Sequence, residues 1–285
     1  MSLEYSITYK AENTYENWVD DAYWQFLIIP ENNSTQQFIT IGFDNSLKAE
    51  NEFSINGYEF RTIRVHPKQK FKSISFEASF KLVKKEVNPF DFHINAGLEK
   101  EYAEIKRLVF KVDFEPFLCK THFTSIRSLD NKIFLFESDK SIFENLQTLN
   151  NWTYIYLYYK TGVTSVHTTL DEVIHKRQGV CQDFAHLFCA LARENGIPTR
   201  YVSGYLHQGN GYFGDSQMHA WCEAYIPFVG WVGFDPTNNL LAGHNHIKVA
   251  HGKDYRDCSP LRGVVFSSGT NETKHSVMVH SQQQQ

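Results

Sequence analysis

Three side chains that together could carry out nucleophilic catalysis lie far apart in the sequence, and the first is a cysteine. Cys181 follows Gly179-Val180 and begins a predicted amphipathic helix. A helix N-terminus carries about half a positive elementary charge and has unpaired N–H groups. Both features favour the nucleophilic thiolate, and the same N–H groups can receive a developing oxyanion. We therefore predict that Cys181 is a nucleophile. The alternative is a small buried residue, as we expect for Cys189 deeper in the same helix.

The second and third side chains are a histidine and an aspartate. A catalytic thiol needs a base that exchanges protons near neutral pH, which suits histidine. Among 13 histidines, His219 is distinguished by an alternating segment that places it with Trp221 on the polar and aromatic side of a strand. Asp235 ends the next predicted strand, and a hairpin would bring it beside His219 to fix the imidazole tautomer. The alternatives are a surface histidine and a turn aspartate before Pro236.

Other residues close to this set are candidates for supporting roles. The amides of Gln178 and Gln182 could help to hold an oxyanion, although solvated glutamines are an equally good interpretation. The backbone N–H of Cys181 is the more direct donor. Trp221 could shield the thiol and imidazole from water, or belong to the core. Asp183 suits the first helical turn as a structural residue.

Three helices and three strands must position these residues. A cap at Ser138 or Asp139 and a capping box from Thr169 to Glu172 predict the first two helix starts. The expected helices run from about 139 to 159, from 169 to 178 and from 181 to 195, and the expected strands cover 199–206, 218–226 and 231–234. Helices followed by an antiparallel sheet indicate an α+β fold.

The first part of the chain has a different pattern. Segments 37–43, 58–66 and 71–83 alternate apolar and polar residues with period two, which predicts strands with one buried face. We therefore expect a β-rich, sandwich-like N-terminal domain at 1–115 and a catalytic domain at 116–275. A short polar tail at 276–285 is expected to be disordered.

The composition excludes several classes of protein. The 285 residues are 42% hydrophobic, 21% charged and 15% aromatic, which is typical of a globular protein. A net charge of −4 gives no basic excess for nucleic acid or an anionic membrane. We find no apolar segment of the ~18 residues that a spanning helix needs, and no apolar core of a secretory signal at the start. Five cysteines, an odd number, favour a reducing, cytoplasmic location.

Four motifs carry a resemblance to a known family. They are Gly179–His186, Gly196–Tyr205, His219–Glu223 and Gly233–Thr237. With them the chain resembles the transglutaminase-like superfamily, more narrowly its bacterial members described as cysteine proteases, most strongly over 150–240. The resemblance implies a papain-like α+β core and thiol acyl transfer on amides. It also places the family's catalytic Cys, His and Asp at Cys181, His219 and Asp235.

Three functions remain open at this point. The first is a hydrolase of peptide or isopeptide amides that acts through a Cys-His-Asp triad and a thioester. The second is a transglutaminase, in which an amine accepts the acyl group, and the third is a binding scaffold with a dormant triad. Calcium-regulated cross-linkers of the family have acidic cation sites, and the absence of such a loop here favours hydrolysis. We expect a protein or peptide substrate and neither metal nor organic cofactor. The sequence makes no prediction of oligomeric state.

Two further patterns suggest ligands that we do not favour. Gly209, Gly211 and Gly214 match the spacing of a dinucleotide-binding loop, but such a loop must begin a helix, and a strand-like segment follows instead. We predict a flexible hairpin loop at the lip of a groove. The histidines at 244, 246 and 251 could bind a metal ion, yet solvated loop histidines are the favoured interpretation.

Overall fold

Alternation of buried and exposed side chains shapes the first strand, β1 (Ser2–Val19), in which every second residue from Tyr5 to Tyr15 is buried. β1 pairs antiparallel with β6 (Phe71–Lys85) and β15 (Asn271–Gln283), and β3 (Gln36–Asn45) pairs with β6. A strand with one buried face needs a second layer to cover that face. The second layer is an antiparallel sheet with the order β14 (Leu261–Phe266), β2 (Asp21–Phe26), β5 (Arg61–Val65) and β4 (Asn51–Ile55).

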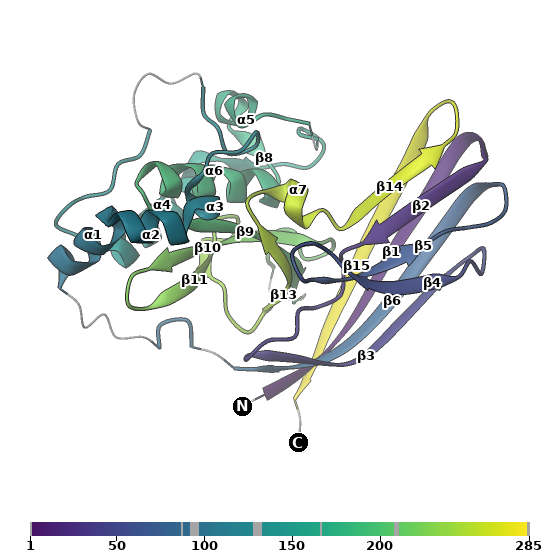
Figure 1. Ribbon diagram of the computed structural model, residues 1–285, viewed down its shortest axis with the longest axis horizontal. Helices are drawn as coiled ribbons and strands as arrows, with labels where there is room; N and C mark the ends of the chain where they lie inside the picture. The colour runs from purple at the N-terminus through teal and green to yellow at the C-terminus, as the bar shows by residue number, and fades with distance from the viewer. Residues whose placement is uncertain are drawn as a thin grey trace.

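These two sheets pack face to face as a β-sandwich on one side of the computed structural model of the protein (Figure 1). Phe76 of β6 contacts Trp24 and Phe26 of β2, with ring centroids 5.3 and 4.7 Å apart. The sandwich agrees with the β-rich N-terminal region that the alternating segments predict. The structure describes residues 2–86, 88–91, 97–127, 133–165, 167–207 and 211–283.

The end of the chain corrects the prediction of a disordered tail from residue 276. β15 pairs with β1 from Asn271 to Gln283 and buries Val277 and Val279 in the sandwich. Likewise β14, which we expected in the catalytic domain, pairs with β2. The ladder hydrogen bonds come from the backbone, so a polar sequence with few buried side chains can still form a strand. The other predicted domain bounds remain predictions.

Helices and a five-stranded antiparallel sheet form the second region (Figure 1). The sheet order is β12 (Leu240–Leu241), β11 (Gly230–Asp235), β10 (His219–Ile226), β9 (Thr199–Leu206) and β13 (His246–Gly252). The helices are α1 (Leu98–Lys106), α2 (Leu108–Asp113), α3 (Glu115–Leu118), α4 (Ile142–Tyr156), α5 (Leu170–Lys176), α6 (Cys181–Glu194) and α7 (Tyr255–Cys258). β7 (Tyr158–Tyr159) and β8 (Gln178–Gly179) form a parallel pair. This architecture confirms the α+β class. Within the described ranges, every helix is too short or too polar to cross a membrane.

Local sequence signals decide where the helices begin. Thr169 forms the predicted capping box of α5. α4 is capped by Ser141 rather than by Ser138 or Asp139, because only Ser141 has a glutamate three residues later to complete a capping box. α6 begins at Cys181 as predicted, after the residue Val180 in an extended conformation.

The sandwich holds β13 of the helical region in place. Gln36 on β3 donates a hydrogen bond to the backbone oxygen of Lys248 at 2.7 Å, and the Lys84 ammonium group on β6 donates to the backbone oxygen of His246. The Tyr205 hydroxyl of β9 donates in the other direction, to the backbone oxygen of Ile28 at 2.6 Å. These contacts couple the position of β13 to the sandwich.

A buried ion cluster joins three strands of the five-stranded sheet. Glu223 of β10 accepts hydrogen bonds from Arg200 of β9 and from Lys248 of β13, the latter at 2.8 Å. Burial would raise the pKa of Glu223, but the two cations overcome it and lower the pKa to about 2. Because this folded-state pKa is depressed, the cluster stabilises the fold above the unfolded pKa of about 4.5, and this stabilisation is lost as the pH falls towards 2.

We expect Glu223→Gln to lower the free energy of unfolding by about 3 kcal/mol at pH 7, because Arg200 loses its carboxylate partner and Lys248 keeps only Glu31, at 3.8 Å. In the wild type, protonation of Glu223 should lower the free energy of unfolding between pH 4.5 and 2. In the variant this part of the pH dependence should be absent. Urea unfolding at several pH values measures both effects. Glu77→Gln is the control, since Glu77 forms an exposed ion pair with Lys10 and should cost less than about 1 kcal/mol. Equal effects of the two substitutions would contradict the prediction.

Candidate active site

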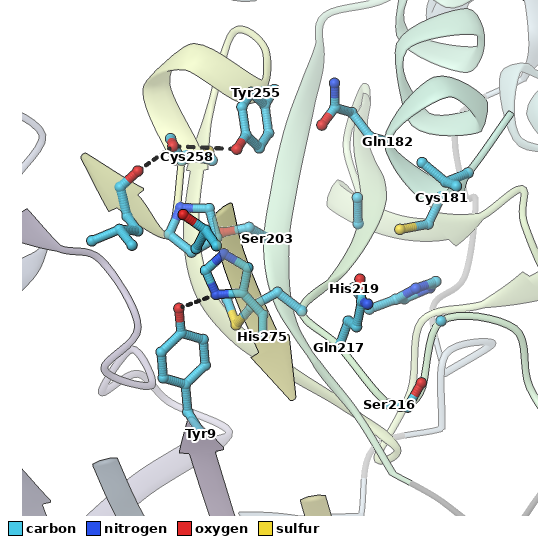
Figure 2. A pocket seen from close by; sticks show the side chains of 18 of the residues that line it. Tyr9, Cys181, Gln182, Ser203, Ser216, Gln217, His219, Tyr255, Cys258 and His275 are labelled. Carbon is cyan, nitrogen blue, oxygen red and sulfur yellow. Dashed lines mark hydrogen bonds between the residues drawn. The ribbon is translucent and has the colours of Figure 1, made fainter. Parts of the chain in front are cut away.

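Cys181 lies where α6 meets a cavity of about 710 Å³ between the helical region and the sandwich. Its side chain is half-buried and lies above His219 in the view of Figure 2. Gly179 allows the chain to enter the helix closely, because a Cβ there would lie 2.6 Å from the side chain of Asp183. The carboxylate of Asp183 in turn accepts the backbone N–H of Val180 at 2.8 Å. These contacts fix the helix start that presents the thiol.

His219 and Asp235 form a buried hydrogen-bonded pair. Register pairs Cys222 of β10 with Phe234 of β11, so the next position along β11 places Asp235 diagonally opposite His219. The His219 Nε2 atom lies 2.8 Å from Asp235 Oδ2, and both side chains are fully buried. Burial disfavours the imidazolium, but the carboxylate outweighs it and raises the pKa of His219. The pKa of Asp235, which burial alone would raise, is lowered by His219.

The other ring nitrogen of His219 faces the thiol. A Cβ built on Gly214 would lie 2.7 Å from His219 Nδ1 and 3.8 Å from Cys181 Sγ, so both atoms border one small space. Hydrogen bonding and charge from Cys181 contribute to the raised pKa of His219 after the larger effects of burial and Asp235. Nδ1 has no aligned hydrogen bond to any described residue, as is common for catalytic pairs before substrate binds.

Gly214 is the glycine that leaves this space open, and it has a φ of +82°. We expect Gly214→Ala to reduce the alkylation rate of Cys181 by iodoacetamide about tenfold, because the new methyl group displaces the imidazole. Gly211→Ala is the matched control: its φ is +72°, and nothing lies within 4 Å of the added Cβ. Both variants should lose about 1 kcal/mol of stability through backbone strain. Equal alkylation rates of the two variants would show that Gly214 is needed only for its backbone conformation, and not for the space beside the thiol.

Asp235 has more partners than the sequence predicts. Its Oδ2 atom also accepts hydrogen bonds from His246 Nε2 at 3.1 Å and from Asn238 Nδ2 at 2.9 Å. Its Oδ1 atom accepts the backbone N–H groups of Thr237 and Asn238 at 3.0 and 3.3 Å. Five donors therefore fix the carboxylate in one orientation.

His246 corrects the prediction of solvated loop histidines. It is buried on β13, and its Nδ1 atom accepts the backbone N–H of Gly243 at 3.3 Å. Its Nε2 atom therefore carries the proton that it donates to Asp235. Burial lowers the pKa of His246, which keeps the ring neutral. The ligand atoms of His219, Asp235 and His246 lie within 4.8 Å of one another, but this proton arrangement favours a hydrogen-bonded network over metal ligation.

The predicted supporting residues lie in different environments. Gln182 lines the cavity above Cys181, whereas Gln178 is on β8 and is not among the described residues that line the cavity (Figure 2). Trp221 is buried and packs beside His219 and edge-on to His246, with centroids 6.3 and 5.3 Å apart, so it belongs to the core behind the histidines.

Sequence reasoning missed His246, Asn238 and the functional place of Gly214. The segment from Asp235 to Asn238 has the residue types of a turn in which a side-chain oxygen accepts backbone N–H groups, and this signal could have found Asn238. The expected glycine loop lies partly outside the described residues, at 208–210. Gly214 follows this loop and lies beside the His219 ring, and it does not form part of a nucleotide-binding loop.

Comparison with known proteins finds similarity over this part of the chain. Residues 127–236 match the family model of the transglutaminase-like superfamily. An uncharacterized protein of Mycobacterium leprae is 40% identical over 125 residues, which are 42% of this chain and 44% of that protein. A protein-glutamine gamma-glutamyltransferase of Pseudomonas aeruginosa is 33% identical over 98 residues, 32% of this chain and 14% of that enzyme. The chain thus spans less than half the length of these curated relatives.

A solved structure shares the whole fold. The crystal structure of a candidate cysteine protease from Cytophaga hutchinsonii superposes with a TM-score of 0.76, over 100% of this chain and 92% of that one, at 20% identity. At this level of identity the likeness concerns the fold, and it includes the sandwich as well as the helical region.

Proposed function

We propose that this protein is a thiol-dependent amide hydrolase with Cys181, His219 and Asp235 as its catalytic triad, because residues 127–236 match the family model of the transglutaminase-like superfamily. The main support is one geometric observation. The Cys181 sulfur and the His219 Nδ1 atom border the same space at the floor of the cavity, while Nε2 of the same ring is held by a buried carboxylate. This is the thiol, base and orienting-group arrangement that nucleophilic catalysis requires.

The reaction starts with transfer of the thiol proton to His219, whose imidazolium is stabilised by Asp235. The thiolate attacks the amide carbonyl, and the negative oxygen faces the N–H groups at the start of α6, where the helix dipole is favourable. His219 Nδ1 then donates its proton to the leaving amine, and a thioester to Cys181 remains. Water, deprotonated by His219, hydrolyses the thioester and restores the thiol.

His246 and Asn238 act as positioning residues for Asp235. Each donates one hydrogen bond to the oxygen that also accepts from His219. These hydrogen bonds hold the Asp235 carboxylate in the plane that His219 needs. They also keep the carboxylate ionised, because hydrogen bonds to the charged form lower the pKa of a carboxyl group.

Transfer to an amine is the second candidate. It has the same acyl-enzyme and differs only in the acceptor. The partial similarity to a protein-glutamine gamma-glutamyltransferase supports it. The experiment that separates the two gives the protein a glutamine-containing peptide with and without a fluorescent primary amine. We expect hydrolysis to dominate, with release of ammonia or cleaved peptide. Incorporation of most of the label would assign the transferase activity instead.

The reactivity of the Cys181 thiol tests the alternative that the protein is a binding scaffold with a dormant triad. Iodoacetamide at pH 6 should alkylate Cys181 faster than the exposed Cys119, whose pKa is raised by a hydrogen bond from its thiol to Glu115. Peptide mapping by mass spectrometry measures the two rates in one sample. An unreactive Cys181 at pH 6 would overturn the proposed enzyme activity.

A further inference from the structure

β15 is an edge strand of the sandwich, since its sheet has the order β15, β1, β6 and β3. Three of its residues, Asn271, Thr273 and His275, line the cavity that Cys181 and His219 also line. Figure 2 shows His275 together with Cys181 and His219 at this cavity. The edge of β15 and the thiol therefore border the same space.

The backbone of Val277 shows which groups of β15 point away from β1. Its N–H group donates to the backbone oxygen of Ser216 at 2.9 Å, outside the ladder with β1. In an antiparallel strand, the N–H and C=O groups of one residue point to the same side, and every second residue shares that side. The register with β1 runs without a shift from residue 271 to 283. The backbone groups of residues 271, 273 and 275 therefore also point away from β1.

A second hydrogen bond supports this assignment. The Glu16 N–H group of β1 donates to the backbone oxygen of Thr270 at 3.0 Å, so the even-numbered positions are the ones that bond to β1. Within the described ranges, the backbone groups of residues 271, 273 and 275 have no hydrogen bond outside this ladder, and all three residues are exposed. They form an unpaired strand edge, and such an edge is a template for pairing with another chain.

Ser216 occupies the beginning of the position that a further strand would take beside β15. It lies three residues before His219 and two residues after Gly214, where an added Cβ would be 3.8 Å from the Cys181 sulfur. A chain that continued from Ser216 along the edge towards Asn271 would lie about 4.8 Å from β15. This position is in the cavity that contains the thiol.

On the basis of the proposed function, we propose that the substrate is an extended polypeptide segment that pairs as an added strand with the edge of β15 at Asn271, Thr273 and His275. A polypeptide supplies N–H and C=O groups on each side at every second residue, which is the spacing that this edge offers. Hydrogen bonds between the two backbones supply the affinity in this mode of recognition. A folded segment already uses these groups in its own structure, so the substrate is an unfolded segment or a loop.

The first experiment measures how well three pools of random octapeptides protect Cys181 from iodoacetamide. One pool has an unmodified backbone, one is N-methylated at alternate residues and one at every residue. The first two should reach half-protection at concentrations within about threefold of each other, because an added strand donates to β15 from every second residue only. The fully methylated pool should give no protection at an about tenfold higher concentration, because it has no backbone donors.

The second experiment removes one N–H group of the protein. Thr273→Pro deletes the outward N–H group and keeps the ladder to β1, because a proline is tolerated on an edge strand where its nitrogen faces away from the sheet. Half-protection by the unmodified pool should need about tenfold more peptide, since one donor is lost and the ring occupies the place of the added strand. Thr273→Val keeps the N–H group and is the matched control, which should behave like the wild type. Each protein is compared with its own alkylation rate without peptide.

Thermal melting shows whether both variants fold, and the peptide pools decide alone if Thr273→Pro does not. Equal protection by all three pools, protection by the unmodified pool alone, or no protection of a reactive Cys181 would each overturn the inference. A folded Thr273→Pro that is protected like Thr273→Val would also overturn it. A dimer of the wild type that dissociates in Thr273→Pro would assign the edge to a second copy of the chain instead. An unreactive Cys181 at pH 6 would overturn the proposed function, and the inference with it.

Discussion

Turnover is expected to fall by about 10⁴-fold or more in Cys181→Ala, because the acyl-enzyme can no longer form. The free energy of unfolding should change by less than about 1 kcal/mol, since the side chain is half-exposed and fills no core position. Cleavage of peptides selected from a library measures kcat/KM, and thermal melting measures stability. Cys181→Ser keeps the shape and tests the need for a thiolate.

Cys119→Ala is the control for nonspecific loss of a thiol. Cys119 is exposed at the C-terminal end of α3 and does not line the cavity, so its removal should leave kcat/KM unchanged. Retention of full activity by Cys181→Ala would exclude nucleophilic catalysis by this cysteine. A loss of activity accompanied by unfolding would contradict the expected stability, because the substitution deletes a single sulfur atom at a cavity surface.

For Asp235→Asn we expect a loss of about 10⁴-fold in kcat/KM. The amide has one acceptor oxygen, so its NH2 group meets N–H donors at the other position, and it has no charge to stabilise an imidazolium. Since Asp235 raises the pKa of His219, its replacement lowers that pKa, and the thiol loses its proton acceptor near neutral pH. The alkylation rate of Cys181 at pH 6 should therefore fall strongly, and recover only at alkaline pH.

Asp235→Ala has a different expected outcome. It leaves two buried imidazoles and two backbone N–H groups unpaired, so unfolding should become easier by about 3–5 kcal/mol. Comparison of the two variants by urea unfolding and by alkylation across pH separates the catalytic role of the carboxylate from its structural role. An Asp235→Asn variant with a wild-type pH profile would show that Asp235 serves stability alone.

The helices and the central strands were predictable because their signals are local. The box from Thr169 to Glu172 and the stop at Asn195-Gly196 lie within a few residues of the ends that they set. The strand-like segment predicted at 199–206 forms β9 with these bounds. The grouping of Cys181, His219 and Asp235 was inferred from motifs. The structure places Cys181 and His219 at one cavity and buries Asp235 in hydrogen-bond contact with His219.

Long-range pairing was not predictable in the same way. β15 pairs with β1, for example at Asn271 and Tyr15. The sequence of β15 is polar and does not predict a strand. The strand is stabilised by backbone hydrogen bonds to β1, which lies far away in the sequence. His246 was missed for a related reason. Its burial depends on β13 pairing with β9 and on the contact of that strand with the sandwich, and no local pattern encodes either.

β15 pairs with β1, the first strand of the sequence, and this pairing affects the order in which parts of the fold can form. Synthesis proceeds from the N-terminus, so Cys181, His219 and Asp235 leave the ribosome before residues 261–283. Until those residues add β14 and β15 to the edges of the two sheets, the nascent protein lacks one side of the compartment around its thiol. The addition of β14 and β15 therefore extends both sheets and also encloses the Cys181 thiol.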